Sequence, residues 1–314
     1  MSRKSKYDIS IVFPLYNESS NILTVFENTR KVMLEIDRTF ELIFVNDGSN
    51  DNSLEILRNI QEKYVFVKVI SLYKNNGKAN ALEVGFNNTS SDIIVSLDID
   101  NQFNSNDIIK FIDKIGEGYD IVSGVRKIRQ DDLTIRITSK IFNMIVKLFT
   151  GLKFEDFFSG FKCYRKSVLD YLALFGNLYR FAAVIAYKKG FKVCEIPVEH
   201  KKRIKGKSSY NFLQRVRIAI SDLIMIFFMI LFNNDKVYYL KISTYFSLIF
   251  GLIIYFIHTK FPDQKFLENL YFMVIYFSIQ ILIILKICDL FFERHEGEID
   301  KRKRNIEKTF GFNL

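Results

Sequence analysis

The sequence has few of the residues that stabilise secreted or loop-rich proteins. Its 314 residues contain three cysteines, three prolines, three histidines and no tryptophan. Cys163, Cys194 and Cys288 show no CxxC spacing and cannot all pair, which argues against a zinc site and a disulfide framework. We interpret them as reduced cysteines in a cytosolic or membrane-embedded setting.

An export signal is also missing from the start of the chain. Residues 1–6 are basic, but the apolar run that follows, Ile9–Phe13, is short and ends at Pro14. We therefore expect the first two-thirds of the chain to stay in the cytoplasm. Internal repeats, low-complexity tracts and Pro- or Gly-rich linkers are absent from the sequence as well.

Charge is plentiful but unevenly distributed. The formal net charge is +10, and charged residues are dense up to Arg217 but sparse from there to Cys288. The first part reads as a water-soluble domain and the second as a membrane part. A basic surplus suits nucleic acid, anionic lipids or phosphorylated substrates. Basic residues followed by long apolar runs favour the lipid, so we expect no nucleic-acid partner.

Short apolar runs alternate with helical patterns in the N-terminal half. Predicted buried strands lie at 9–13, 41–46, 65–71, 93–97 and 120–123, and predicted helices at roughly 19–36, 52–62, 79–88 and 106–116. This alternation indicates crossover units and therefore an α/β fold with a mostly parallel sheet. Ligands of such sheets bind beyond the carboxyl ends of the strands.

The C-terminal third contains two long apolar stretches. Ile242–Ile257 and Leu270–Leu285, with their flanking residues, each approach the ~20 residues that a spanning helix needs. The short polar segment 258–269 between them predicts a helical hairpin. The earlier run Leu223–Phe232 is too short to span and predicts an amphipathic helix at the interface.

The positive charges predict the orientation of this hairpin. Lys260 and Lys265 lie in its loop, whereas six basic residues follow it: Arg294, Lys301, Arg302, Lys303, Arg304 and Lys308. The positive-inside tendency places this tail in the cytoplasm. Two spans keep the tail and the N-terminal domain on that same side, as expected for a multi-pass protein of the cytoplasmic (inner) membrane.

Two carboxylates follow the fourth predicted strand. Asp98 and Asp100 are one residue apart and point the same way in an extended segment. Carboxylate and phosphate oxygens are the ligands that Mg²⁺ and Mn²⁺ prefer. The alternative is an Asp-rich surface loop, but the position directly after a buried strand favours a metal site.

Polar residues also follow the first two strands. Pro14 ends the first strand, and Tyr16 and Glu18 behind it suit a base and a ribose. Asn46 and Asp47 end the second strand, where Asp47 has a carboxylate that can accept from a nucleobase N–H. An ordinary turn and a helix cap are the structural alternatives.

A fourth motif precedes the third predicted helix. Gly77 and Lys78 stand at the start of that helix, where main-chain N–H groups and a lysine suit a phosphate. A solvated lysine is the alternative for Lys78 taken alone.

In this order, the four motifs resemble family 2 glycosyltransferases of the nucleotide-diphospho-sugar (GT-A) fold. That family has P-x-Y-N-E, D-D-G-S-x-D, N-x-G-x-x-x-A-L and D-A-D-x-Q at its strand ends. This sequence departs from the pattern at Asn46, where the family usually has Asp. Further residues resemble the polyprenyl-phosphate branch, the bactoprenol glucosyltransferase and dolichyl-phosphate mannose synthase type: Gly124–Arg126, Arg136, Ser139, Asp156–Phe161, Arg180, Glu195–Val198, His200 and Arg203–Tyr210.

The resemblance implies an inverting transfer of a sugar from a nucleotide sugar to a polyprenyl (undecaprenyl) phosphate. It favours UDP over GDP and suggests a homotetramer. The implied donor-binding residues are Pro14, Tyr16, Glu18, Asn46, Asp47, Lys78, Asp98, Asp100 and Gln102. Mg²⁺ or Mn²⁺ is expected on Asp100 and Asp98, and the acceptor phosphate on Arg126, Arg136, Ser139 and Arg203. Asp156 and Asp100 are the implied catalytic residues, and Asp156 would act as a base or as an orienting group.

Three other functions compete with this one. A processive polysaccharide synthase carries Q-x-x-R-W, which a chain without tryptophan does not have. A transferase acting on a lipid-linked oligosaccharide stays open. A non-catalytic assembly module with a decayed domain is supported only by Asn46, and the intact Asp98, Asp100 and Asp156 argue against it.

These predictions divide the chain into four parts. They are a cytoplasmic GT-A catalytic domain at 1–210, amphipathic interface helices at 211–235, a transmembrane hairpin at 236–290 with spans at about 240–258 and 268–287, and a basic cytoplasmic tail at 291–314.

Overall fold

The fold is that of a computed structural model, which describes residues 6–126, 133–157, 159–172, 176–201, 217, 221, 234–261, 264–303 and 306–310. By its internal contacts, the chain separates into two compact units. The first comprises Met1–Asp222 and Lys301–Leu314, and the second comprises Leu223–Asp300. The further division into catalytic domain, interface helices, hairpin and tail stays a prediction.

The five predicted strands and four predicted helices of the first unit are confirmed, but Pro14 does not end β1, which continues to Leu15 and pairs there with Asn46. The strands are β1 (Ile9–Leu15), β2 (Phe40–Asn46), β3 (Val67–Leu72), β4 (Ile93–Ser96) and β5 (Ile121–Val125). The helices are α1 (Ser19–Leu34), α2 (Ser53–Gln61), α3 (Lys78–Asn87) and α4 (Asp107–Gly116). Seven further elements were not predicted: α5 (Leu133–Thr150), β6 (Lys162–Arg165), α6 (Lys166–Leu172), the 3-10 helix η1 (Gly176–Phe181), α7 (Ala182–Lys188), β7 (Val193–Pro197) and β8 (Ile306–Phe310).

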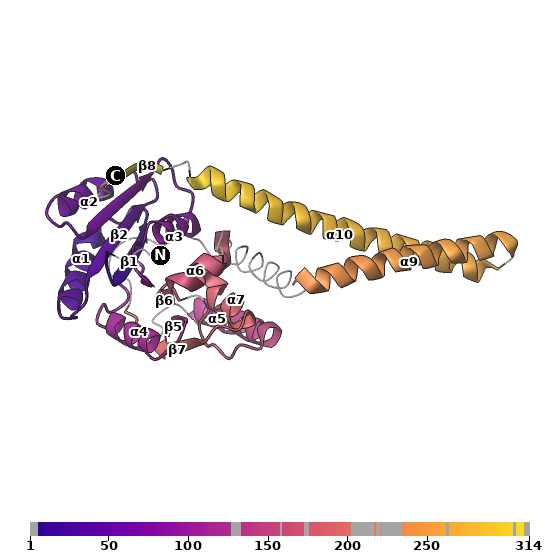
Figure 1. Ribbon diagram of the computed structural model, residues 1–314, viewed down its shortest axis with the longest axis horizontal. Coiled ribbons are helices and arrows are strands. Elements are labelled where there is room, and N and C mark those ends of the chain that lie inside the picture. The colour runs from indigo at the N-terminus through magenta and orange to yellow at the C-terminus, as the bar shows by residue number, and fades with distance from the viewer. Residues whose placement is uncertain are drawn as a thin grey trace. The chain divides into compact units, whose positions relative to one another are not determined.

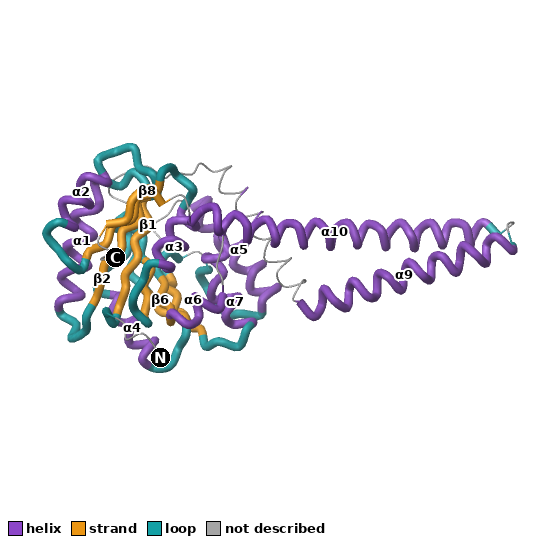
Figure 2. Tube along the Cα trace, turned by 45° about the horizontal axis from the view of Figure 1, so that its top comes forward, coloured by secondary structure: helices purple, strands orange, loops and turns teal. Residues whose placement is uncertain are grey.

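The strands form one mostly parallel sheet, as predicted. Its order is β7-β5-β6-β4-β1-β2-β3-β8, and Figure 2 shows the strands running through the middle of the unit with helices around them. β1 pairs in parallel with β2 and β4, β2 with β3, and β5 with β7. β6 runs antiparallel between β4 and β5, and β8 runs antiparallel along β3.

Apolar side chains cover both faces of this sheet. On one face, Phe13 stacks on Phe44 at 4.8 Å between ring centroids and joins a buried cluster that includes residues of α1, α2 and α4. On the other face, α3 packs closely because Gly85 meets Val12 without a side chain of its own. Strands buried on both faces read as continuous apolar runs, which explains why the sequence revealed them.

A closed network of polar side chains lies at the amino ends of the strands. Glu41, in β2, is fully buried and forms an ion pair with Lys68 of β3. Ser10 Oγ of β1 donates to Glu41 Oε1 at 2.5 Å. Ser90 N and Oγ, just before β4, donate to the same atom at 2.8 Å. This network therefore joins four neighbouring strands at the end of the sheet away from the predicted site.

The second unit contains the two predicted apolar helices. α9 (Asn234–Lys260) and α10 (Lys265–Lys303) lie side by side (Figure 1). Each holds a segment long and apolar enough to cross a membrane, Lys241–Lys260 and Lys265–Lys286. Only 17% and 6% of these windows are buried, unlike the core helices of a soluble domain. The apolar side chains of the hairpin therefore face outward.

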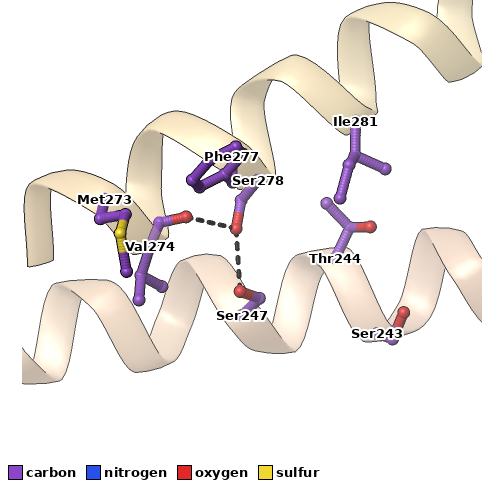
Figure 3. Close-up of a pocket in the computed structure, with 8 residues that line it drawn as sticks. All are labelled: Ser243, Thr244, Ser247, Met273, Val274, Phe277, Ser278 and Ile281. Atoms are coloured by element: carbon purple, nitrogen blue, oxygen red, sulfur yellow. Dashed lines mark hydrogen bonds between the residues drawn. The ribbon is translucent and has the colours of Figure 1, made fainter. Parts of the chain in front are cut away.

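Small and hydroxyl side chains bring the two helices together. A Cβ on Gly251 would lie 2.8 Å from Ile275 Cγ1, so glycine permits close contact there. Ser278 Oγ lies 2.9 Å from Ser247 Oγ and donates to Val274 O at 2.8 Å (Figure 3). Such contacts are typical of helices that associate within lipid.

The predicted interface helices and the predicted tail differ in how much of them the structure describes. The predicted interface helices, 211–235, lie almost wholly outside the described residues. Within the predicted tail, 291–314, α10 continues to Lys303, and β8 then pairs with β3 of the first unit.

Candidate functional site

The loops that follow β1 and β2 are fastened to each other. Asn17 N donates to Ser49 Oγ at 2.9 Å, and Asn50 N donates to Asn17 Oδ1 at 2.9 Å. Asn17 adopts a positive φ of 55°, a conformation that asparagine tolerates better than most residues. Tyr16 and Glu18, which flank Asn17, are consequently held at the carboxyl edge of the sheet, partly exposed.

Asn46 and Asp47 are buried at the end of β2, and their polar atoms are engaged within the protein. Asn46 Nδ2 donates to Ser71 Oγ at 3.1 Å, and its Oδ1 accepts from Ser49 N at 3.2 Å. Asp47 accepts from the main-chain N–H groups of Asn76 at 2.9 Å and Gly77 at 2.8 Å. Burial raises the pKa of Asp47, although these two hydrogen bonds oppose the rise. Asp47 thus anchors the loop before α3.

The glycine after Asp47 lets these two loops touch. Gly48 has a φ of +66°, and a Cβ there would lie 2.5 Å from the carbonyl carbon of Lys74 and 2.7 Å from Asn75 N. Any larger residue would separate the β2–α2 loop from the loop that leads to Lys78.

Lys78 and the Asp98–Asp100 pair meet at the centre of the carboxyl edge. The Lys78 ammonium forms an ion pair with Asp98, and both side chains are partly exposed. Desolvation lowers the pKa of Lys78, but the negative charges of Asp98 and Asp100 outweigh it, so the pKa is raised. Asp98 rests on Gly160, where a Cβ would lie 2.6 Å from the carboxyl carbon. Only glycine leaves room for Asp98 there.

Asp100 begins a loop that is attached to the segment after β7. Asp100 Oδ1 accepts from Gln102 N at 3.2 Å. The Gln102 side chain donates to Lys201 O at 3.2 Å, while Lys201 N donates to Gln102 O at 2.7 Å. Gln102 therefore holds the start of the segment in which Arg203 lies, and Arg203 itself is outside the described residues.

A second ion pair lies at the end of β5. Arg126 Nε and Nη2 donate to the two carboxylate oxygens of Asp156 at 2.6 and 2.9 Å. Their side chains are only 12% and 4% exposed. Glu195 accepts from the main-chain N–H groups of Glu155 at 2.6 Å and Asp156 at 2.9 Å, and burial raises its pKa. The fork geometry thus fixes the guanidinium in one orientation.

The remaining predicted acceptor residues lie on α5. Arg136 is within this helix, and Ser139 is partly buried there. Asn143, one turn further on, donates to Glu155 O at 2.6 Å and so joins α5 to the segment that carries Asp156.

Sequence reasoning missed Lys162, which is 2% exposed in β6. Burial lowers the pKa of Lys162 to about 7. The signal was present, since Lys162 is the only charged residue between Gly160 and Tyr164, beside the apolar Phe161 and Cys163.

The residues at the carboxyl edge fit a divalent cation that a substrate helps to bind. The described residues contain no group of three or more His, Cys, Asp or Glu able to hold a metal ion alone. Asp98 and Asp100 supply carboxylate oxygens only. Mg²⁺ characteristically uses one or two carboxylates, several waters and substrate phosphates. The donor set therefore suits a hard cation that arrives with a diphosphate.

The sheet and the charged groups along its carboxyl edge define a GT-A-like α/β domain. Among solved structures, glucosyl-3-phosphoglycerate synthase from Mycobacterium tuberculosis in complex with Mn²⁺, uridine-diphosphate and phosphoglyceric acid is similar in fold. The TM-score is 0.54 at 18% identity, over 74% of this chain and 81% of that one. Residues 10–173 match Glycosyl transferase family 2, and the chain belongs to this family.

Two curated relatives of the chain are both described as undecaprenyl-phosphate 4-deoxy-4-formamido-L-arabinose transferase. The protein of Pseudomonas aeruginosa is 30% identical over 211 residues, which cover 67% of this chain and 62% of the relative. The protein of Proteus mirabilis is 32% identical over 213 residues, which cover 67% and 65%. The match thus spans less than two-thirds of the length of either relative.

Proposed function

We propose that the chain transfers a sugar from a nucleotide sugar to a polyprenyl phosphate of the undecaprenyl type. One observation carries the proposal: two charged groups lie at the carboxyl ends of the parallel strands. The first group is Lys78 with Asp98 and Asp100, and the second is Arg126 with Asp156. The first group suits the diphosphate of a donor, and the second suits the phosphate of an acceptor. The family and the described activity of the relatives support this reading.

On the donor side, the chain's own residues hold a diphosphate. Lys78, at the start of α3, supplies a cation and lies beside main-chain N–H groups that attract phosphate oxygens. A divalent cation bound by Asp100 and Asp98 would neutralise the charge that develops on the leaving diphosphate. Tyr16 and Glu18 are partly exposed and border the place for the nucleoside. Pro14, Asn46 and Asp47 are buried at the ends of β1 and β2 beside them.

On the acceptor side, Arg126 offers a fixed guanidinium. A guanidinium carries five N–H donors, and two of those of Arg126 point at Asp156. A phosphate monoester has a second pKa of about 6, so a polyprenyl phosphate is already mostly ionised near neutral pH. The acceptor therefore needs orientation more than deprotonation, and we assign Asp156 the role of orienting Arg126.

The reaction that fits this arrangement is a single displacement. A phosphate oxygen of the acceptor attacks the anomeric carbon as the bond from that carbon to the diphosphate oxygen breaks, with inversion. The electron pair of the broken bond goes to the diphosphate. No covalent enzyme intermediate is required, and the residues of the chain contribute position and charge.

The chain's surface supports action at a membrane. The two candidate spans expose most of their apolar side chains. On the first unit, three residues form an exposed apolar stripe along α5: Ile141, Met144 and Leu148, which are 50%, 64% and 83% exposed. Lys140 and Lys147 flank that stripe. A basic helix with an apolar face suits the surface of an anionic bilayer.

Two further parts of the proposal concern topology and assembly. β8, after α10, pairs with β3, so the chain must return to the side on which the first unit lies. An even number of spans satisfies this, because it leaves both ends of the chain on the cytoplasmic side.

We also propose a homotetramer, which the mass of the detergent-solubilised protein would test.

The decisive experiment supplies the purified chain with undecaprenyl phosphate and labelled nucleotide sugars. The panel contains UDP-glucose, UDP-N-acetylglucosamine, UDP-4-deoxy-4-formamido-L-arabinose and GDP-mannose, each with Mn²⁺, Mg²⁺ or EDTA. We expect label from one UDP-sugar in the lipid phase, abolished by EDTA. Label entering only a lipid-linked oligosaccharide would favour that alternative acceptor. No transfer and no donor hydrolysis under any condition would indicate a non-catalytic module.

A further inference from the structure

Lys162 is a buried lysine that neither predicted binding group includes. It belongs to β6, and its side chain is shielded from water, with 2% of the residue exposed. Lysines are almost never this buried unless they are paired, because an ammonium loses much hydration free energy. Because so little of Lys162 is exposed, the side chain does not reach a substrate directly in this conformation.

The Lys162 ammonium is surrounded by main-chain carbonyl oxygens. Nζ donates to Arg180 O at 2.8 Å and makes longer contacts with Phe157 O at 3.4 Å and Tyr179 O at 3.5 Å. An ammonium has three N–H donors, which matches these three acceptors. Desolvation lowers its pKa to about 7, and the nearby carboxylates Asp156 and Glu195 oppose that change.

These three carbonyls belong to two segments that reach opposite halves of the site. Phe157 directly follows Asp156, which orients Arg126 on the acceptor side. Tyr179 and Arg180 belong to η1, and the Tyr179 ring centroid lies 5.9 Å from Lys78 Nζ on the donor side. Lys162 is therefore the link between the segment of Asp156 and the segment beside Lys78.

The same strand also brings a donor carboxylate into this connection. Gly160, two residues before Lys162, packs directly against the Asp98 side chain. Gly160 O accepts from Ser96 Oγ of β4 at 3.2 Å. A shift of the segment between Asp156 and Lys162 would consequently move both Asp98 and Asp156.

We propose that Lys162 is a positioning residue that sets the distance between the donor and acceptor halves of the site by tying the segment of Asp156 to η1. The inference rests on the proposed sugar transfer. It predicts a specific kinetic effect, because a misplacement of about 1 Å costs on the order of 100-fold in rate while each substrate still binds its own half.

The test compares Lys162→Met and Lys162→Arg with wild type in the full-length, detergent-solubilised chain. Lys166→Met is the matched control, because Lys166 donates to a main-chain carbonyl, Phe86 O at 3.1 Å, away from the site. Folded protein is quantified by thermal unfolding, and kcat and both KM values are measured per folded molecule. We expect Lys162→Met to lower kcat at least tenfold with both KM values within threefold of wild type, and Lys162→Arg to recover part of that loss.

Other outcomes overturn the inference. A kcat of folded Lys162→Met within threefold of wild type would mean that Lys162 only stabilises the fold. A raised donor KM with unchanged kcat would mean that it contacts the donor. If Lys162→Met does not fold, Lys162→Gln takes its place, and a kcat of folded Lys162→Gln within threefold of wild type refutes positioning. A wild-type protein that transfers no sugar would instead refute the proposed function, which distinguishes the two failures.

Discussion

Both ends of the sheet contain ion pairs, but the paired side chains at the two ends differ in how much of their surface a ligand can reach. At the amino end, Glu41 is fully buried, and its contacts with Lys68, Ser10 and Ser90 all come from within the protein. At the carboxyl end, Lys78 and Asp98 pair while 33% and 24% of their side chains face solvent. Arg126 and Asp156, at the same end, are nearly as buried as Lys68 and Glu41. Accessibility therefore distinguishes the proposed donor pair, Lys78 and Asp98, and not every charge pair of the proposed site.

The largest effect expected from this comparison is on the accessible end. Replacing Asp100 by Ala removes a proposed metal ligand and should lower sugar transfer by roughly 10³-fold, the size seen when one transition-state charge contact is lost. Initial rates of label transfer to lipid, measured per folded protein, check this. Asp92→Ala is the control, because Asp92 is exposed just before the other end of β4. A near-normal rate in Asp100→Ala would remove Asp100 from the donor site.

The next effect belongs to the closed end and concerns stability. Lys68→Met leaves the buried Glu41 without its cation, which costs about 3 kcal/mol or more in the free energy of unfolding. The thermal midpoint should fall markedly, while kcat and KM of the molecules that remain folded stay at wild-type values. Altered KM values at unchanged stability would contradict the assignment of a structural role to the amino end and of ligand binding to the carboxyl end.

A smaller effect is expected on the acceptor half of the carboxyl end, where Arg126 and Asp156 lie. Arg126→Ala should raise the KM for polyprenyl phosphate by about tenfold, since a charge-assisted hydrogen bond contributes about 1.5–3 kcal/mol. The donor KM should change little. Arg126→Lys keeps the charge but loses the fork, so its acceptor KM should lie between the two. An unchanged acceptor KM in both variants would exclude Arg126 from phosphate binding.

The smallest effect is a dependence of stability on pH. The pKa of Lys162 is about 7 in the folded chain and near 10.5 in the unfolded chain. Between pH 7 and 9 the unfolded state therefore binds more protons, and this group makes stability rise with pH. Asp156 and Glu195 favour its charge, whereas Lys78 and Arg180 disfavour it. The thermal midpoint of wild type should rise more steeply over this range than that of Lys162→Met; equal slopes would contradict the lowered pKa.

Much of the fold followed from local pattern, and the misses share a cause. β1 to β5 are runs of apolar residues between helical patterns, so each strand can be predicted from its local sequence. β6 and β7 contain Lys162 and Glu195, whose charges break the apolar pattern and are explained only by partners distant in sequence. β8 has apolar residues only at its two ends, Ile306 and Phe310, and its partner strand β3 is more than 200 residues away in the sequence.

The site was foreseeable in its residue types but not in its contacts. Asp98 and Asp100 at a strand end indicated a hard cation, and their placement beside Lys78 agrees with that interpretation. Asp47 has the right chemistry for a nucleobase, yet both of its oxygens accept from the loop before α3. No sequence pattern distinguishes a carboxylate that binds a ligand from one that holds the loop beside it.

The pairing of β8 with β3 has a consequence for biosynthesis. β8 lies downstream of both candidate spans, so a ribosome completes α9 and α10 before it makes β8. Until then the outer edge of β3 has unpaired main-chain groups, a condition that invites pairing with other chains. The last strand of the sheet is therefore added only after both candidate spans have been made, which ties completion of the domain to synthesis of the hairpin.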